Sequence, residues 1–120
     1  MTRPRKSPER EIYGIIGKLN NASKIQKEWN AHFKKKGIDA FMAKYPTKPD
    51  QLPERLSEMF HFDRRMYLVG EDLQESVGQL LDELDESTDE GKVSTIKNEG
   101  GIFIGFFQNI DTLAPQPVLP

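Results

Sequence analysis

Residues 92–109 read KVSTIKNEGGIFIGFFQN. Apolar residues run up to the sequence NEGG at residues 98–101 and continue directly after it. A glycine-containing turn between two such segments is typical of a β-hairpin. Because the second segment contains Ile102, Phe103 and Ile104, we expect the hairpin to pack against the rest of the protein.

The size and composition of the chain limit what it can be. Its 120 residues correspond to one domain, and the formal net charge of −2 gives no general attraction to nucleic acid or to an anionic membrane. The absence of cysteine excludes disulfides, thiolate catalysis and zinc–thiolate sites. No apolar run approaches the roughly 20 residues that a membrane helix needs, and the N-terminus lacks a hydrophobic signal segment. We therefore expect a cytoplasmic protein that binds neither nucleic acid nor membrane.

The segments before the hairpin predict strands and helices in alternation. Three segments contain short apolar runs or alternating apolar residues, and we interpret them as strands: 11–17, 38–46 and 64–70. Three others have apolar residues at helical spacing, and we interpret them as helices: 23–37, 50–60 and 73–87. This order predicts a three-layer α/β/α fold with a mostly parallel sheet, which the C-terminal hairpin makes mixed.

Boundary residues refine the first two helices. Ser23 followed by Gln26 has the spacing of a capping box, and Gly37 after three lysines is typical of a helix C-terminus. Asp50 is the expected N-cap of the second helix, with Pro53 in its first turn.

Both ends of the chain differ in composition from the middle. Residues 1–10 are basic, contain two prolines and have no apolar periodicity, so we expect a flexible arm. A nucleic-acid contact is the less favoured interpretation of its positive charge. Residues 113–120 form a proline-rich tail, so the expected folded domain is 11–112.

Familiar chemical motifs are missing from the sequence. No glycine-rich dinucleotide or phosphate motif follows a strand, which predicts no nucleotide cofactor. His32 and His61 are the only histidines, so no metal site is predicted. The acidic segment 80–90 lacks regular ligand spacing, and we interpret it as a solvated helix end and loop rather than a cation site.

The order of several short motifs resembles the N-terminal, substrate-binding domain of the shikimate dehydrogenase family. In that family a helix ending LLDEL precedes a strand with Ala-Val-Asn-Thr and a strand ending Gly-Tyr-Asn-Thr-Asp. This chain has LLDEL at 80–84, KVST at 92–95 and GFFQN at 105–109. Near the N-terminus, the matches lie in the first strand, the Ser-x-Ser-Pro loop and the next helix: Ile16, Gly17, Ser23 and Asn30. The resemblance covers about residues 12–111.

The resemblance implies that the catalytic pair of the family is missing. The family oxidises shikimate with NADP and uses a lysine and an aspartate at the reacting hydroxyl. Those positions correspond to Gln74 and Asn109 here, and neither amide can act as an acid or a base. The nucleotide domain that follows in the family is not expected in this chain. We therefore expect no catalytic residue and no cofactor.

The resemblance also suggests where a ligand would bind. Ile25 replaces a substrate-binding serine of the family and Phe107 an asparagine, whereas Ser23 is equally well explained as a helix cap. The expected substrate-binding residues are Ser23, Gln74, Ser94, Thr95 and Asn109. A neutral lining of this kind suits a small polar molecule, shikimate- or quinate-like but uncharged.

Two alternatives stay open. The surface around Ile25, Phe106 and Phe107 faces a nucleotide domain in the family, and its exposure would favour a homo-oligomer or another protein partner. Partial shikimate or quinate oxidoreductase activity with a separate NADP-binding chain is the less favoured alternative, because both catalytic positions are changed.

Overall fold

The computed structural model describes residues 10–88 and 90–110. The predicted basic arm, apart from its last residue, and the predicted proline-rich tail lie outside these ranges. In the described part, every helix is too short or too polar to cross a membrane.

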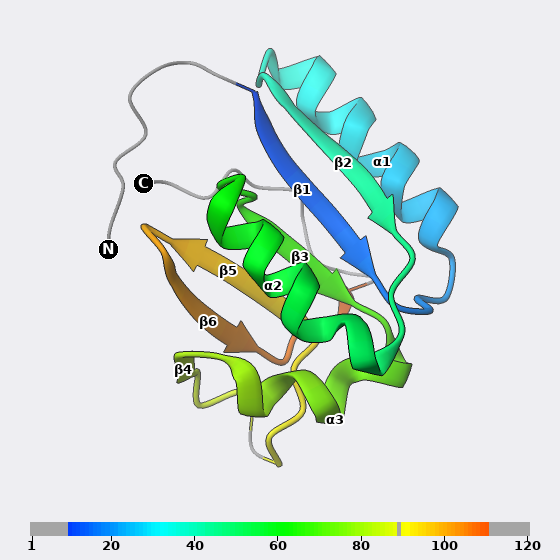
Figure 1. Ribbon diagram of the computed structural model, residues 1–120. Coiled ribbons are helices and arrows are strands. Elements are labelled where there is room, and N and C mark those ends of the chain that lie inside the picture. The colour runs from blue at the N-terminus through cyan, green and yellow to red at the C-terminus, as the bar shows by residue number, and fades with distance from the viewer. Residues whose placement is uncertain (1–9, 89, 111–120) are drawn as a thin grey trace.

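Six strands form one mixed sheet in the order β2-β1-β3-β5-β6-β4 (Figure 1). The strands are β1 (Glu11–Ile16), β2 (Ala40–Tyr45), β3 (Met66–Val69), β4 (Glu83–Leu84), β5 (Thr95–Glu99) and β6 (Ile102–Phe106). The pairs β1–β2, β1–β3 and β4–β6 are parallel, whereas β5 runs antiparallel to β3 and β6. The predicted hairpin is confirmed, and Gly100 and Gly101 supply its turn with φ angles of 62° and 95°.

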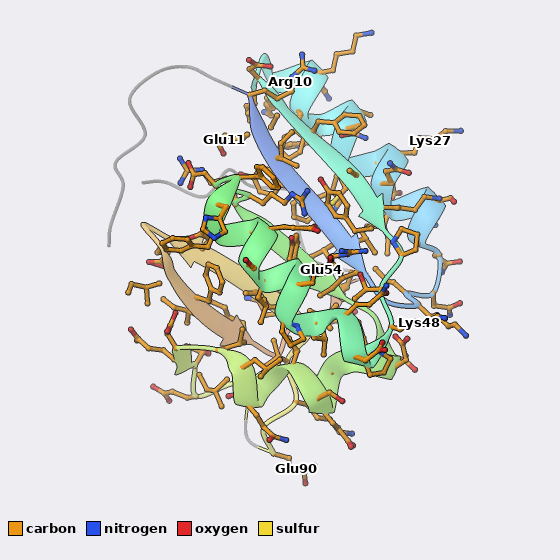
Figure 2. The ribbon with its side chains drawn as sticks, in the orientation of Figure 1. Arg10, Glu11, Lys27, Lys48, Glu54 and Glu90 are labelled. Atoms are coloured by element: carbon orange, nitrogen blue, oxygen red, sulfur yellow. The ribbon has the colours of Figure 1, made fainter. Side chains whose placement is uncertain are left out.

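Helices cover both faces of the sheet, as the sequence predicts. The helical elements are α1 (Ala22–Lys36), α2 (Leu52–His61) and α3 (Gln74–Val77), with the 3-10 turns η1 (Pro49–Gln51), η2 (Glu71–Leu73) and η3 (Gly78–Leu80). One core cluster joins α1 to β1, β2 and β3, and a second joins α2 and α3 to the opposite face. Lys27 on α1 and Glu54 on α2 lie on the outer, exposed sides of their helices (Figure 2).

Helix α1 is bounded by two residues in the left-handed conformation. Gly37 ends it as predicted, with φ of 68°, and its N–H donates to the Lys34 carbonyl at 3.2 Å. The N-cap is Asn21, with φ of 60°, so the predicted capping box at Ser23 is wrong. Because the helix begins before Ser23, that hydroxyl instead accepts a hydrogen bond from Lys44 Nζ at 2.9 Å.

Helix α2 begins at Leu52 and not at the predicted cap Asp50. Asp50 lies inside η1, where the Gln51 side chain accepts a hydrogen bond from the Lys48 N–H at 2.9 Å. Because Asp50 lies within a helical turn, it does not occupy the non-helical position that an N-cap requires, so Asp50 as N-cap is wrong. The apolar side of α2 is buried as predicted.

The helix predicted at 73–87 forms only in part. After α3 the chain passes through η3 and then extends as β4 beside β6. The Asp82 N–H donates to the Phe103 carbonyl at 3.0 Å, and the Asp82 carboxylate accepts from the Phe103 N–H at 2.8 Å. The edge of β6 therefore recruits a segment whose leucine spacing suggests a helix, and Leu80 and Leu84 are exposed.

Side chains of α1 occupy the outer edge of β2. Asn30 Nδ2 donates to the Met42 carbonyl at 3.1 Å, and Asn30 Oδ1 accepts from the Met42 N–H at 2.7 Å. Gln26 Nε2 donates to the same carbonyl at 3.1 Å. These bonds take the place of those that an additional strand would form.

A polar cluster fixes α2 to the sheet. Arg64 Nη1 donates to Glu58 Oε1 at 2.8 Å and to the Tyr67 hydroxyl at 3.0 Å, and that hydroxyl donates to the Arg55 carbonyl at 2.9 Å. The Arg64 guanidinium also lies 4.1 Å from the ring centroid of Tyr45. Burial raises the pKa of Tyr67 to about 12, although the hydrogen bond and charge of Arg64 oppose the rise.

Candidate functional site

A cavity of about 410 Å³ opens at the end of the sheet where β1 and β3 finish. Its wall comes from four segments: 19–20 after β1, 71–75 after β3, 92–94 before β5 and 107–110 after β6. Open α/β sheets bind ligands in the crevice beyond the carboxyl ends of their parallel strands. The cavity is therefore the candidate site.

Gln74 is the first residue of α3 and is held in place at the cavity wall. Its side-chain Nε2 donates to the Val69 carbonyl at 3.1 Å, and its own carbonyl accepts from the Val93 N–H at 2.9 Å. The neighbouring Leu73 is fully buried and anchors the turn. The amide of Gln74 is therefore positioned by the backbone of β3.

Ser94 joins the segment before β5 to the segment after β6. Its hydroxyl donates to the Gln108 carbonyl at 2.7 Å and accepts from the Gln108 N–H at 2.7 Å. Its own N–H donates to the Phe106 carbonyl at 2.8 Å, and its side chain is almost completely buried. Ser94 thus fixes the segment that presents Gln108 and Asn109 at the cavity.

Charged side chains line the cavity as well, so the expectation of a neutral lining is wrong. Glu71 and Glu75 come from η2 and α3, and Lys92 comes from the segment before β5. Lys92 Nζ lies 3.9 Å from Glu75 Oε1. Glu71 forms no ion pair with any residue in 10–88 or 90–110.

The structure brings together three of the five predicted site residues. Gln74, Ser94 and Asn109 all line the cavity. Ser23 lies on the exposed surface of α1, and Thr95 is fully buried in β5, so neither belongs to the cavity wall. The Thr95 hydroxyl has no hydrogen-bond partner within the described residues.

The predicted interaction surface is smaller than expected. Ile25 is buried between α1 and the sheet, so it is not available to a partner. Phe107 is 45% exposed, and Phe106 is partly buried under the cation of Lys97, whose Nζ lies 4.8 Å from the ring centroid.

The loop after β1 packs directly against the chain after β3. A Cβ atom on Gly70 would lie 2.5 Å from the Lys18 nitrogen, and the Lys18 N–H donates to Asp72 Oδ1 at 2.8 Å. The family resemblance places a threonine at Gly70. In this chain, the space next to that position is filled by backbone.

Sequence reasoning misses the three charged residues of the wall: Glu71, Glu75 and Lys92. A signal for Glu71 is present, because it lies two residues after the end of a buried strand that pairs in parallel. The sequence gives no separate indication of the 3-10 turn η2, which lies just before the predicted helix 73–87 and brings the chain from β3 into the cavity wall.

Comparison with known proteins gives matches among solved structures. A shikimate dehydrogenase in complex with NADP+ matches with a TM-score of 0.76 and 25% identity, over 86% of this chain and 36% of that chain. Shikimate 5-dehydrogenase from Listeria monocytogenes, in complex with shikimate and NAD, matches with a TM-score of 0.75 and 20% identity, over 88% and 37%. No protein-family model matches the sequence, and no curated protein matches it significantly.

The same fold also occurs in a reductase that is named for a different substrate. The 5-ketofructose reductase of Gluconobacter sp. strain CHM43 matches with a TM-score of 0.76 and 17% identity, over 82% of this chain and 36% of that chain. This chain therefore spans little more than a third of each matched protein.

The fold and the cavity define an open α/β domain with a crevice at the carboxyl ends of its parallel strands. More particularly, the chain has the fold of the N-terminal domain of shikimate dehydrogenases. The sequence resemblance predicts this fold.

Proposed function

We propose that this domain binds a small, hydroxyl-rich molecule of the shikimate or quinate type in the cavity and does not oxidise it. The observation that carries the proposal is the meeting of Gln74, Ser94 and Asn109, which come from three separate segments, at one cavity. The matched shikimate dehydrogenases include structures with shikimate, and the matched reductase is named for a ketose, which supports a polyhydroxylated ligand.

Two positions support binding without oxidation. The resemblance places Gln74 at the catalytic lysine of the family and Asn109 at its aspartate. Carboxamides do not exchange protons in the way that general acid–base catalysis requires. The proposal therefore includes no catalytic residue and no cofactor. It also includes a cytoplasmic location for the protein.

Calorimetric titration with shikimate, quinate and their methyl esters tests the binding proposal. We expect saturable binding that Asn109→Ala weakens by about three- to tenfold, the value of one lost hydrogen bond. Ser23→Ala is the matched control, because Ser23 lies on α1 outside the cavity wall. The proposal would be contradicted if none of the four ligands produced a measurable heat of binding.

A separate assay tests the absence of oxidation. NADP-linked turnover of shikimate is measured with the protein alone and after mixing with a nucleotide-binding chain from the same source. We expect no turnover of shikimate, either by the protein alone or after mixing with the nucleotide-binding chain. Turnover that is lost in Gln74→Ala would show that the amide takes part in catalysis and would overturn this part of the proposal.

Self-association is the second candidate function, and the exposure of Phe107 favours it. This aromatic ring borders the cavity and is 45% exposed. A second copy that covered Phe107 would bury apolar surface at the cavity mouth. Sedimentation velocity over a wide concentration range is the test: association that Phe107→Ser abolishes supports it, and a monomer at every concentration excludes it.

A further inference from the structure

Two hydrogen-bond donors of the cavity wall are already used within the protein, and the ammonium group of the wall lies in an ion pair. Gln74 Nε2 donates to a backbone carbonyl of β3 at 3.1 Å, and the Ser94 hydroxyl donates to the Gln108 carbonyl at 2.7 Å. Lys92 Nζ lies 3.9 Å from a carboxylate oxygen of Glu75. A ligand carboxylate would have to displace the Gln108 carbonyl to accept from the Ser94 hydroxyl, which has one donor hydrogen, and it would approach Lys92 beside the Glu75 carboxylate.

The negative charges of the wall exceed the positive ones. Glu71 and Glu75 contribute two carboxylates, against the single ammonium group of Lys92. The adjoining hollow adds Lys18, but the Asp72 carboxylate, which accepts the Lys18 N–H at 2.8 Å, adds an equal negative charge. Glu71 has neither an ion-pair nor a hydrogen-bond partner in the described part of the chain, so its oxygens are available as acceptors.

We infer that the cavity selects ligands rich in hydroxyl donors and without a carboxylate, and that Glu71 sets this preference. The inference rests on the proposed binding function and narrows its ligand class to neutral polyols, including esters of hydroxy acids. A ligand hydroxyl can donate to the Glu71 carboxylate, whereas a ligand carboxylate would be repelled by it. The effect is modest because Glu71 is exposed to solvent.

Shikimate and its methyl ester form the test pair, because they carry the same ring hydroxyls and differ in charge. Dissociation constants are measured by calorimetry at low ionic strength. We expect the ester to bind about two- to fivefold more tightly than shikimate, and the ratio to shrink in about 0.3 M salt, where charges are screened over a few ångströms. Glu71→Gln is expected to strengthen shikimate binding and to reduce the same ratio.

Glu28→Gln is the matched control, since Glu28 lies exposed on α1 and its substitution changes the net charge of the protein equally. Shikimate binding that equals or exceeds ester binding would overturn the inference while leaving the proposed binding function intact. An ester preference that Glu71→Gln leaves unchanged would overturn the role of Glu71. Absence of binding for both ligands would overturn the binding function itself, and this inference with it.

Discussion

The hydroxyl of Ser94 and the backbone of Gln108 exchange two hydrogen bonds, each 2.7 Å long. This pair ties the entrance of β5 to the exit of β6 and thereby holds the segment that carries Asn109. The sequence resemblance places Ser94 at a substrate-binding asparagine of the family. In this structure the Ser94 side chain stabilises the cavity wall through hydrogen bonds within the protein. The Ser94 hydroxyl therefore already forms hydrogen bonds to the Gln108 backbone when no ligand is bound.

Replacement of Ser94 by alanine should destabilise the fold. The substitution leaves a partly buried carbonyl and N–H of Gln108 without their partner, which costs about 1–3 kcal/mol of unfolding free energy. Urea denaturation monitored by Trp29 fluorescence measures the change. Ser76→Ala is the control, because Ser76 is exposed on α3, and equal stability of the two variants would contradict the structural role of Ser94.

A side chain at Gly70 should also lower stability. In Gly70→Ala the new Cβ would lie 2.5 Å from the Lys18 nitrogen, so the loop after β1 must move. Overpacking of this kind costs about 1–3 kcal/mol, and Gly70→Thr should cost more than Gly70→Ala. Thermal unfolding of both variants is compared with that of Glu71→Ala, a neighbouring exposed position. An unchanged melting temperature for Gly70→Ala would show that the loop does not pack as closely as the structure has it.

Loss of the Asn30 side chain should expose the edge of β2. Asn30→Ala removes the side-chain acceptor of the Met42 N–H and one of the two side-chain donors to the Met42 carbonyl, which should cost about 1–2 kcal/mol and favour pairing with another strand. Light scattering at increasing concentration detects the association. Gln26→Ala removes a single bond to the same carbonyl and should have a smaller effect. If Asn30→Ala stays as stable and as monomeric as the unaltered protein, the amide does not protect this edge.

Unfolding free energy should fall at alkaline pH because of Tyr67. Its pKa is raised by burial to about 12 in the folded protein, against about 10 in the unfolded chain. The folded state therefore retains this proton between those values, so the stabilising contribution is complete below about pH 10 and is lost as the pH rises toward 12. The difference in unfolding free energy between the unaltered protein and Tyr67→Phe should narrow from about pH 9 to about pH 11. A constant difference would contradict the shift.

Much of the fold could be predicted because strands and the first two helices have clear apolar periodicity. The β1 strand and α1 are continuous and are followed by Gly17 and Gly37, so local sequence and tertiary packing agree. The helix prediction for 73–87 is wrong in its second half. The leucines there have helical spacing, but the edge of β6 provides hydrogen-bond partners for an extended backbone. The outcome of this competition between local and long-range hydrogen bonds cannot be predicted from the sequence of the segment alone.

The site could be predicted only where motif order fixes the register. The resemblance predicts Gln74, Ser94 and Asn109, because each lies at a fixed distance from, or within, a recognisable motif. The charged wall at Glu71 depends on the 3-10 turn η2, whose formation has no apolar period to signal it. The resemblance predicts Thr95 as a wall residue because it keeps the residue type of the family, but Thr95 lies fully buried outside the wall.

The central claim is that the cavity binds a small hydroxyl-rich molecule, and an NMR titration of isotopically labelled protein tests it most directly. Methyl shikimate is added while the side-chain amide signals of Gln74, Gln108 and Asn109 are followed, with that of Gln26 on α1 as the internal reference. We predict saturable shifts of the three cavity amides with one shared dissociation constant and no shift of Gln26. Shifts confined to surfaces outside the cavity, or none at saturating ligand, would contradict the claim.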